Sequence, residues 1–438
     1  MQKFYLNSLL LLTLTALSPW HCSFAESLVF PPYLHSYGIR KATPMDLFMF
    51  FGIKTSFSDP QGIATAHLKS WKNLKNNKDD DIVVYGVNSG KCEIIFNSSM
   101  RTLGRYGEKG CGKDQFLFPK GIAADANGNV FVADSGNNRI VRLFNPLSKL
   151  IWKTSFNGAS MNDAGLSGPS RVAVDEKVNV YANDPGHRRI VVFDSTNAIV
   201  RTIPSASIDF KFFDGPTALA IADGASHWSH NNSEQLLFCA DKNGSRVLKF
   251  SFDGHLLAQT DMPSGHIACY GATDYYHNFW VTDQKNHCIV KFDHNLKLLD
   301  VFGSFGNKKN QFIEPRGIAI FKRFGQVFIA EKKGAQYFWI GTNCKKAALT
   351  ENADGRYLLY INATEPTLVS LFTSFSNDTQ YFLKQRLIPS GNSTLNFVTE
   401  EKKRIPERGL TLKTEATYSS FSFVASYCPI NVTNSISR

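Results

Sequence analysis

Nine basic residues stand in a repeated hairpin turn or at the start of the strand that precedes it, and their chemistry is anion binding. They are Lys120, Arg139, His187, Arg188, Arg189, Arg246, Lys285, His287 and Arg316. Arginine can hold a carboxylate or a phosphate through two parallel N–H···O bonds, while lysine supplies a compact positive charge. The formal net charge of the chain is +11. These residues predict a basic surface that binds an anionic ligand or partner.

Patterns for catalysis or metal binding are sparse by comparison. The chain has no GxSxG motif, and spacing alone pairs no cysteine with a histidine and a carboxylate. His266 is the one histidine near a position where a channel metal would bind, and we expect it to be a solvated or hydrogen-bonded residue. Asp125 and Asp175 each follow a short apolar strand and are expected to be turn acids. We predict no catalytic residue, no metal site and no cofactor, and leave a channel metal ion open.

The hairpin that carries these cations recurs at regular intervals. NVFVADSGNNRIVRLF (129–144) is the clearest copy, and others begin at Tyr85, Tyr181, Phe238, Trp280 and Phe328. Successive turn acids are between 42 and 57 residues apart, which is typical of a four-stranded propeller blade. Each acid, or its substitute, is expected to bond the turn that follows it. These positions are Asn88, Asp134, Asp184, Asp241, Asp283 and Glu331.

A second marker runs in phase with the first: a proline followed by a short strand of small apolar residues. The prolines are Pro60, Pro119, Pro169, Pro216, Pro263 and Pro315. Proline can begin a strand where no ladder N–H is needed, and small residues suit a strand at a crowded centre. We predict six blades over residues 46–345, with a strand near residues 47–52 completing the last blade and removing its unpaired edge.

The segment VADSGNNRIV at 132–141 resembles the repeat motif of NHL-repeat six-bladed β-propellers, and the resemblance covers about residues 45–345. Asn88 and Glu331 depart from the motif. The resemblance implies a central channel, with the metal ligands of family enzymes where chains enter the inner strands. The residues after the marker prolines do not form the three-histidine set of amidating lyases or the Glu/Asn/Asp set of lactonases. They are Gln61, Lys120, Ser170, Thr217, Ser264 and Arg316.

The C-terminal quarter has a different character. Residues 356–438 contain short alternating strands separated by Asn/Ser/Gly turns, which is typical of a β-sandwich. The segments EPTLVSL, IPSGNSTLNF and RGLTLKTEATYSS resemble the immunoglobulin-like domain of flagellar hook-capping proteins. This resemblance implies a bacterial source and an envelope or secreted location.

The N-terminus has the pattern of a secretory signal peptide. An apolar run at Leu9–Leu17 precedes the small-x-small sequence Ser23-Phe24-Ala25, so we expect a signal peptide at 1–25 and an extension at 26–45. Export to the periplasm or the medium argues against an RNA partner, although some NHL propellers bind single-stranded RNA. No other apolar stretch approaches spanning length. Seven cysteines would remain, an odd number, so their pairing and the oligomeric state stay open.

The sequence therefore predicts an all-β protein, a six-bladed β-propeller followed by a small β-sandwich. We expect an exported, non-enzymatic binding or scaffold protein whose basic face docks an anionic envelope polysaccharide or a protein partner. Two alternatives remain. One is a metal-dependent lyase or hydrolase that uses the channel, and the other is a self-associating structural module.

Overall fold

The computed structural model describes most of the chain beyond the predicted signal peptide, which lies outside the described residues. The described ranges are 28–29, 41–70, 82–99, 102–146, 149–160, 163–204, 213–352, 354–375, 378–399, 405–406, 409–417 and 425–434. Among them, no helix has the length and apolar character needed to cross a bilayer.

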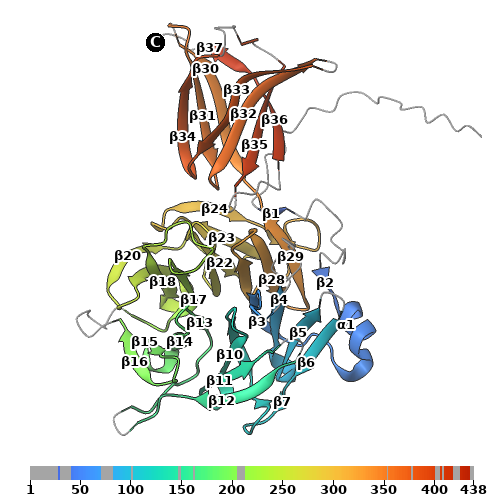
Figure 1. The fold of residues 1–438 in the computed structure, drawn as a ribbon, viewed down its shortest axis with the longest axis vertical. Helices are drawn as coiled ribbons and strands as arrows, with labels where there is room; N and C mark the ends of the chain where they lie inside the picture. The colour runs from blue at the N-terminus through green and yellow to red at the C-terminus, as the bar shows by residue number, and fades with distance from the viewer. Residues whose placement is uncertain are drawn as a thin grey trace, which may run out of the picture.

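Six antiparallel sheets form the body of the described part of the molecule (Figure 1). Five consist of strands that follow one another in the chain, and the sixth also takes strands from the N-terminal region. Blade 1 contains β3 Pro60–Ala66, β4 Val83–Asn88, β5 Glu93–Ser99 and β6 Thr102–Tyr106. Blade 2 contains β9 Pro119–Ala124, β10 Asn129–Asp134, β11 Arg139–Phe144 and β12 Ile151–Phe156. Blade 3 contains β13 Val172–Val174, β14 Val180–Asp184, β15 Arg189–Phe193 and β16 Ile199–Ile203.

Blades 4 to 6 continue the same order. Blade 4 contains β17 Thr217–Asp223, β18 Gln235–Asp241, β19 Arg246–Ser251 and β20 Leu256–Asp261. Blade 5 contains β21 Tyr270–Thr273, β22 Phe279–Asp283, β23 Cys288–Phe292 and β24 Leu298–Phe302. Blade 6 contains β27 Ile318–Phe321, β28 Gln326–Glu331 and β29 Gly334–Ile340. Short two-residue strands lie between blades: β7 Glu108–Lys109 with β8 Gln115–Phe116, and β25 Ser304–Phe305 with β26 Gln311–Phe312.

The first strand of each blade faces the centre, and the six inner strands close into a ring. Each contacts the inner strand of the next blade, and β27 of blade 6 contacts β3 of blade 1. Glycine is needed at this centre. A Cβ on Gly121 would lie 2.8 Å from Arg171 Cα in blade 3, and a Cβ on Gly317 would lie 2.4 Å from Gln61 O in blade 1. The predicted six-bladed propeller is therefore the observed fold.

The N-terminal region completes blade 6, but not with the predicted residues. Strands β1 Leu28–Val29 and β2 Lys41–Ala42 both pair with β29. The segment predicted as this strand, residues 47–52, lies mostly in the helix α1 Pro44–Phe51. The reason is a capping box, in which Thr43 and Asp46 bond each other's backbone and side chain and Pro44 begins the helix.

The C-terminal domain is a sandwich of two four-stranded sheets, and it begins earlier than predicted. The expected start was residue 356, but the first strand is β30 Cys344–Glu351, which pairs with β31 Tyr357–Ala363. These two form a sheet with β34 Gly391–Phe397 and β37 Val432–Asn434. The second sheet contains β32 Thr367–Phe375, β33 Asp378–Ile388, β35 Leu410–Ala416 and β36 Ala425–Ile430.

The sandwich packs beside blade 5 of the propeller (Figure 1). The Lys291 ammonium in blade 5 donates to Thr364 O at 2.9 Å and forms an ion pair with Glu365, and all of these groups are buried. Tyr276 Oη donates to Thr417 O at 2.6 Å. Buried polar contacts therefore join the two domains.

Candidate functional site

The propeller has two faces around its channel. The entrance face, as we call it, carries the marker prolines and the hairpin turns, because the turn acid of each hairpin lies beside the start of the inner strand: Asp134 is the register partner of Pro119. The exit face is the opposite one, where the inner strands end. The nine predicted cations belong to the entrance face.

The turn acids are buried parts of the scaffold. Asp134, Asp184, Asp241 and Asp283 have no exposed surface, and Asn88 and Glu331 have almost none. Asp283 accepts from the backbone of its own turn, as predicted. Asp134 and Asp184 instead accept backbone N–H groups from the loop that precedes their inner strand, those of Leu117 and Ser167, both at 2.7 Å. These acids fasten the entrance loop of the blade to its hairpin.

Three predicted ligand-binding arginines are the partners of these acids. Arg139 Nε lies 2.8 Å from Asp134, Arg189 Nε lies 2.8 Å from Asp184, and Arg246 Nε lies 2.8 Å from Asp241. Arg189 also bonds Asp163, and this hydrogen bond raises the pKa of the guanidinium above its usual value. In each blade the arginine stands directly across the hairpin from the acid. Their guanidinium groups are used in holding the fold.

The other predicted cations divide into two groups. Arg316 pairs with Asp59 and donates to Pro60 O, His187 Nδ1 lies 2.9 Å from Asp184, and His287 Nδ1 accepts from Glu314 N. Lys120 and Lys285 are exposed, and Arg188 is exposed beside Asp214 at 3.6 Å. Of the nine predicted cations, Lys120, Arg188 and Lys285 are therefore the ones that form an exposed basic surface on the entrance face.

Arg171 bridges the channel at the entrance face. Its guanidinium carbon lies 3.4 Å from the centre of the Tyr270 ring, and the guanidinium donates to Cys269 O at 2.7 and 2.9 Å. Tyr270 Oη donates to Gln61 at 2.6 Å. Side chains from blades 3, 5 and 1 therefore meet over the axis. Arg171 was not among the predicted site residues, although the sequence carries a signal for it: Arg171 stands where blades 1, 2 and 6 have Gly62, Gly121 and Gly317.

A cavity of about 670 Å³ opens at the other end of the channel, on the exit face. Its wall includes the ends of five inner strands, and the side chains in it that could contact a ligand include Trp228, Lys322 and Arg323. The Arg323 guanidinium lies over the Trp228 ring at 5.1 Å. Burial lowers the pKa of Lys322, whereas the nearby Asp274, Asp223 and Glu176 carboxylates oppose that shift. We call this cavity the exit pocket.

Carboxylates of the exit pocket are partly used by their own loops. Asp125 accepts from the backbone of Asn127 and Asn129, and Asp175 accepts from that of Lys177 and Asn179. The expectation that these two are turn acids is confirmed. Asp223, which likewise ends an inner strand, accepts from Ala225 N and Glu176 N. All three carboxylates line the exit pocket together with Lys322 and Arg323.

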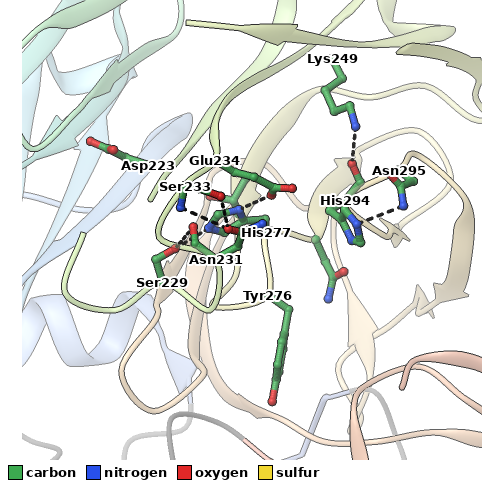
Figure 2. A network of polar contacts seen from close by, with 12 residues as sticks. Asp223, Ser229, Asn231, Ser233, Glu234, Lys249, Tyr276, His277, His294 and Asn295 are labelled. Atoms are coloured by element: carbon green, nitrogen blue, oxygen red, sulfur yellow. Dashed lines mark hydrogen bonds and ion pairs between the residues drawn. The ribbon is translucent and has the colours of Figure 1, made fainter. Parts of the chain in front are cut away.

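The insertion at 224–234 carries Trp228 into the exit pocket, and a polar network holds it against blade 5 (Figure 2). Ser229 Oγ lies 2.6 Å from His277 Nε2, and Glu234 Oε2 lies 3.0 Å from His277 Nδ1. A carboxylate only accepts hydrogen bonds, so the Glu234 contact places the proton on Nδ1 and leaves Nε2 to accept from the serine. Burial lowers the pKa of His277, which favours this neutral ring.

Comparison with known proteins gives one family match. A model of the NHL repeat matches residues 116–143, which contain the hairpin of blade 2. The curated protein "Protein brain tumor" of Drosophila melanogaster is 24% identical over 152 residues, 34% of this chain. That match spans 13% of the length of the Drosophila protein.

Solved structures with a similar arrangement are enzymes by name. A streptogramin B lyase is 14% identical with a TM-score of 0.44, covering 66% of this chain and 95% of its own. A gluconolactonase from Xanthomonas campestris is 12% identical with a TM-score of 0.45, covering 72% and 98%. A virginiamycin B lyase from Staphylococcus aureus is 13% identical with a TM-score of 0.43, covering 66% and 97%. The propeller assignment here rests on the sheet topology rather than on these likenesses. None of the proteins named here is a hook-capping protein.

Proposed function

We propose that this chain is an exported, non-enzymatic binding protein whose ligand site is the exit pocket. The ligand is an acidic sugar, such as a uronic-acid unit of an envelope polysaccharide. The observation that carries the proposal is the placement of the Arg323 guanidinium over the Trp228 ring in a cavity of about 670 Å³ that Lys322 also lines. This proposal retains the anionic ligand predicted from the sequence but places its binding site on the exit face instead of the entrance face.

The mixed charge of the exit pocket suits this ligand. The carboxylate of a uronic acid would bind Lys322 and Arg323, because charge-assisted hydrogen bonds are the strong ones. Its hydroxyl groups can donate to Asp223 and Glu176, which a phosphate or sulfate group without hydrogens could not do. The sugar ring has the apolar C–H face that packs on an aromatic side chain. A simple anion would meet repulsion from those same carboxylates.

Calorimetric titration with an oligogalacturonate and with a neutral oligosaccharide of equal length tests the proposal. We expect binding of the acidic sugar alone, weakened as salt is added. Trp228→Ala and Lys322→Met should each reduce affinity by at least about tenfold, or about 1.4 kcal/mol. Equal affinity for both sugars, or no effect of these two substitutions, would contradict the proposal.

A second candidate is an acyl hydrolase that uses the Ser229–His277–Glu234 relay. The atoms are those a nucleophilic serine requires, with Nε2 toward the hydroxyl and Nδ1 toward the carboxylate. Ser229 Oγ would attack an acyl carbonyl and pass its proton through His277 to the leaving group, and water would then release the acyl group. Against this stand the burial of Ser229, which is 7% exposed, and the Asn231 carbonyl oxygen 3.0 Å from its Oγ, which competes with His277 for the single hydroxyl hydrogen.

Labelling with a fluorophosphonate probe distinguishes a catalytic Ser229 from a Ser229 that only holds the insertion in place. A hydrolase would be labelled once per chain, and Ser229→Ala would remove the label while Ser233→Ala, on the same insertion, would keep it. Absence of label on the native chain would leave the relay as a structural clamp for the insertion.

Self-association is the third candidate, and α1 would be its surface. Phe48, Met49 and Ile53 on and beside this helix are largely exposed, at 56%, 69% and 95%. Contiguous apolar exposure of this kind marks contact surfaces. Sedimentation at increasing protein concentration would give a rising mass for the native chain and a constant mass for Phe48→Ser if the helix mediates assembly.

A further inference from the structure

Blade 5 breaks a rule that blades 2, 3 and 4 obey. In those three blades the buried turn acid is paired with an arginine five residues later, as Asp241 is with Arg246. Blade 6 pairs Glu331 with Lys41 at 3.2 Å, and blade 1 pairs Glu93 with Arg105 at 3.0 Å. In blade 5 the residue five positions after Asp283 is Cys288, and it is the cross-strand partner of that acid.

The place of the guanidinium is taken by a thiol and an imidazole. His266, from the loop between β20 and β21, lies with its Nδ1 2.9 Å from Asp283 Oδ2. The same Nδ1 lies 3.5 Å from Cys288 Sγ. Asp283 has no exposed surface, and hydrogen bonds from the backbone N–H groups of Ile267, Lys285 and Asn286 stabilise its charge. Its ion-pair partner among the described residues is His266.

A single proton on Nδ1 serves the carboxylate at 2.9 Å and leaves only a weak contact with the thiol sulfur at 3.5 Å. If Nδ1 carries a proton, it can donate to the carboxylate and then has no lone pair for the thiol. If Nδ1 is bare, its lone pair faces the carboxylate oxygen. A cation between the three atoms would accept a lone pair from each of them. The three ligand atoms all lie within 4.8 Å of one another, and this is the group of its kind within the searched part of the chain.

We propose that His266, Asp283 and Cys288 bind a zinc ion at the entrance face of blade 5. A nitrogen, an oxygen and a sulfur ligand suit Zn²⁺, whereas Mg²⁺ and Ca²⁺ take oxygen ligands. Three protein ligands leave a fourth tetrahedral position for water or an external donor. The His266 side chain is 23% exposed, which provides the route to solvent, while Asp283 and Cys288 are buried beneath it. This site is separate from the exit pocket, and the sequence analysis predicted no metal here.

Titration of the full chain with Zn²⁺ after treatment with a chelator tests the site. We expect one ion per chain, with affinity reduced more than about 100-fold in both Cys288→Ser and His266→Gln, because each removes a ligand. Cys111→Ser removes the exposed thiol of the blade 2 loop and should change nothing. Binding of Co²⁺ should give the absorption of a thiolate-bound tetrahedral ion, lost in Cys288→Ser.

Cys288→Arg is the sharpest variant, because it restores the pair found in blades 2 to 4. It should fold with unchanged or increased thermal stability and bind no zinc. Should Cys288→Arg fail to fold, the serine variant still decides the question. Absence of zinc binding by the native chain, or equal binding by the Cys288→Ser and His266→Gln variants, would overturn the proposal. So would loss of binding only in Cys111→Ser.

Discussion

The Arg171 guanidinium stacks 3.4 Å from the centre of the Tyr270 ring and so ties blade 3 to blade 5 across the channel axis. Blade 4 lies between these two blades in the ring, so the contact acts as a brace over the entrance. The Tyr270 hydroxyl adds a bond to Gln61 of blade 1, so three blades are joined at this end of the channel. The cavity at the opposite end is left as the exit pocket.

Removing the brace should destabilise the propeller. Arg171→Ala loses the stacking and the bonds to Cys269 O, and we expect the free energy of unfolding to fall by about 2–4 kcal/mol. Tyr270→Phe keeps the ring and loses the bond to Gln61, so a fall of about 0.5–1.5 kcal/mol is expected. Urea denaturation measures both. Arg188→Ala, at an exposed arginine, is the control and should change stability by less than about 0.5 kcal/mol.

Close approach of the inner strands predicts which glycines can be replaced. Gly121→Ala should destabilise the chain by more than about 1 kcal/mol, because its Cβ would lie 2.8 Å from Arg171 Cα and 2.9 Å from Ser170 O. Gly86, in the second strand of blade 1, has only Ile95 O within reach, at 3.8 Å. Gly86→Ala should therefore be neutral or stabilising in thermal melts. Equal losses from both substitutions would contradict a crowded centre.

The junction between the domains should depend on Lys291. Lys291→Met leaves Glu365 and Asp274 buried without their cation, and we expect a loss of about 3–5 kcal/mol. Adding Glu365→Gln should recover part of this loss, because it removes one of the stranded charges. Calorimetry and limited proteolysis would detect the change, with Lys308→Met, at an exposed lysine, as the control. If Lys291→Met alone were as stable as the native chain, the ion pair would not hold the domains together.

Acid should weaken the clamp around His277. Burial lowers the pKa of this histidine, a shift that Lys322 supports and Glu234 and Asp274 oppose. The unfolded chain therefore binds a proton near pH 6.5 that the folded chain takes up only at lower pH. The free energy of unfolding should fall as pH drops below about 6.5. His277→Asn, which tolerates the left-handed backbone at this position (φ 64°), should flatten that slope, and an unchanged slope would contradict the assignment.

The sequence was enough to predict the repeating parts of this fold. Pro119 and Asp134 each mark a sequence position that recurs, with Asn or Glu in place of the acid in two copies, in all six blades, and these six copies in phase defined the propeller. The error at 47–52 arose from apolar likeness to a strand, although Thr43, Pro44 and Asp46 already formed a readable helix start. The early start of the sandwich was missed because β30 follows blade 6 with only a short connection.

The site was harder to predict because charge alone does not show which groups are paired. The register of a two-strand hairpin places Arg139 opposite Asp134, so the internal ion pairs could have been foreseen from the repeat itself. The meeting of Cys288 with His266 could not, because His266 lies in the loop before β21 whereas Cys288 begins β23. Nor could the exit pocket, which combines Trp228 with Lys322 from blades 4 and 6.

Retention on an oligogalacturonate matrix, compared between two variants of the full chain, tests the central claim most directly. One variant carries Trp228→Ala, Lys322→Met and Arg323→Gln in the exit pocket. The other carries Lys120→Ser, Arg188→Ser and Lys285→Ser at the entrance face. We predict that the first is no longer retained and that the second is retained like the native chain. Loss of retention in the second variant alone would contradict the claim and return the binding surface to the entrance face.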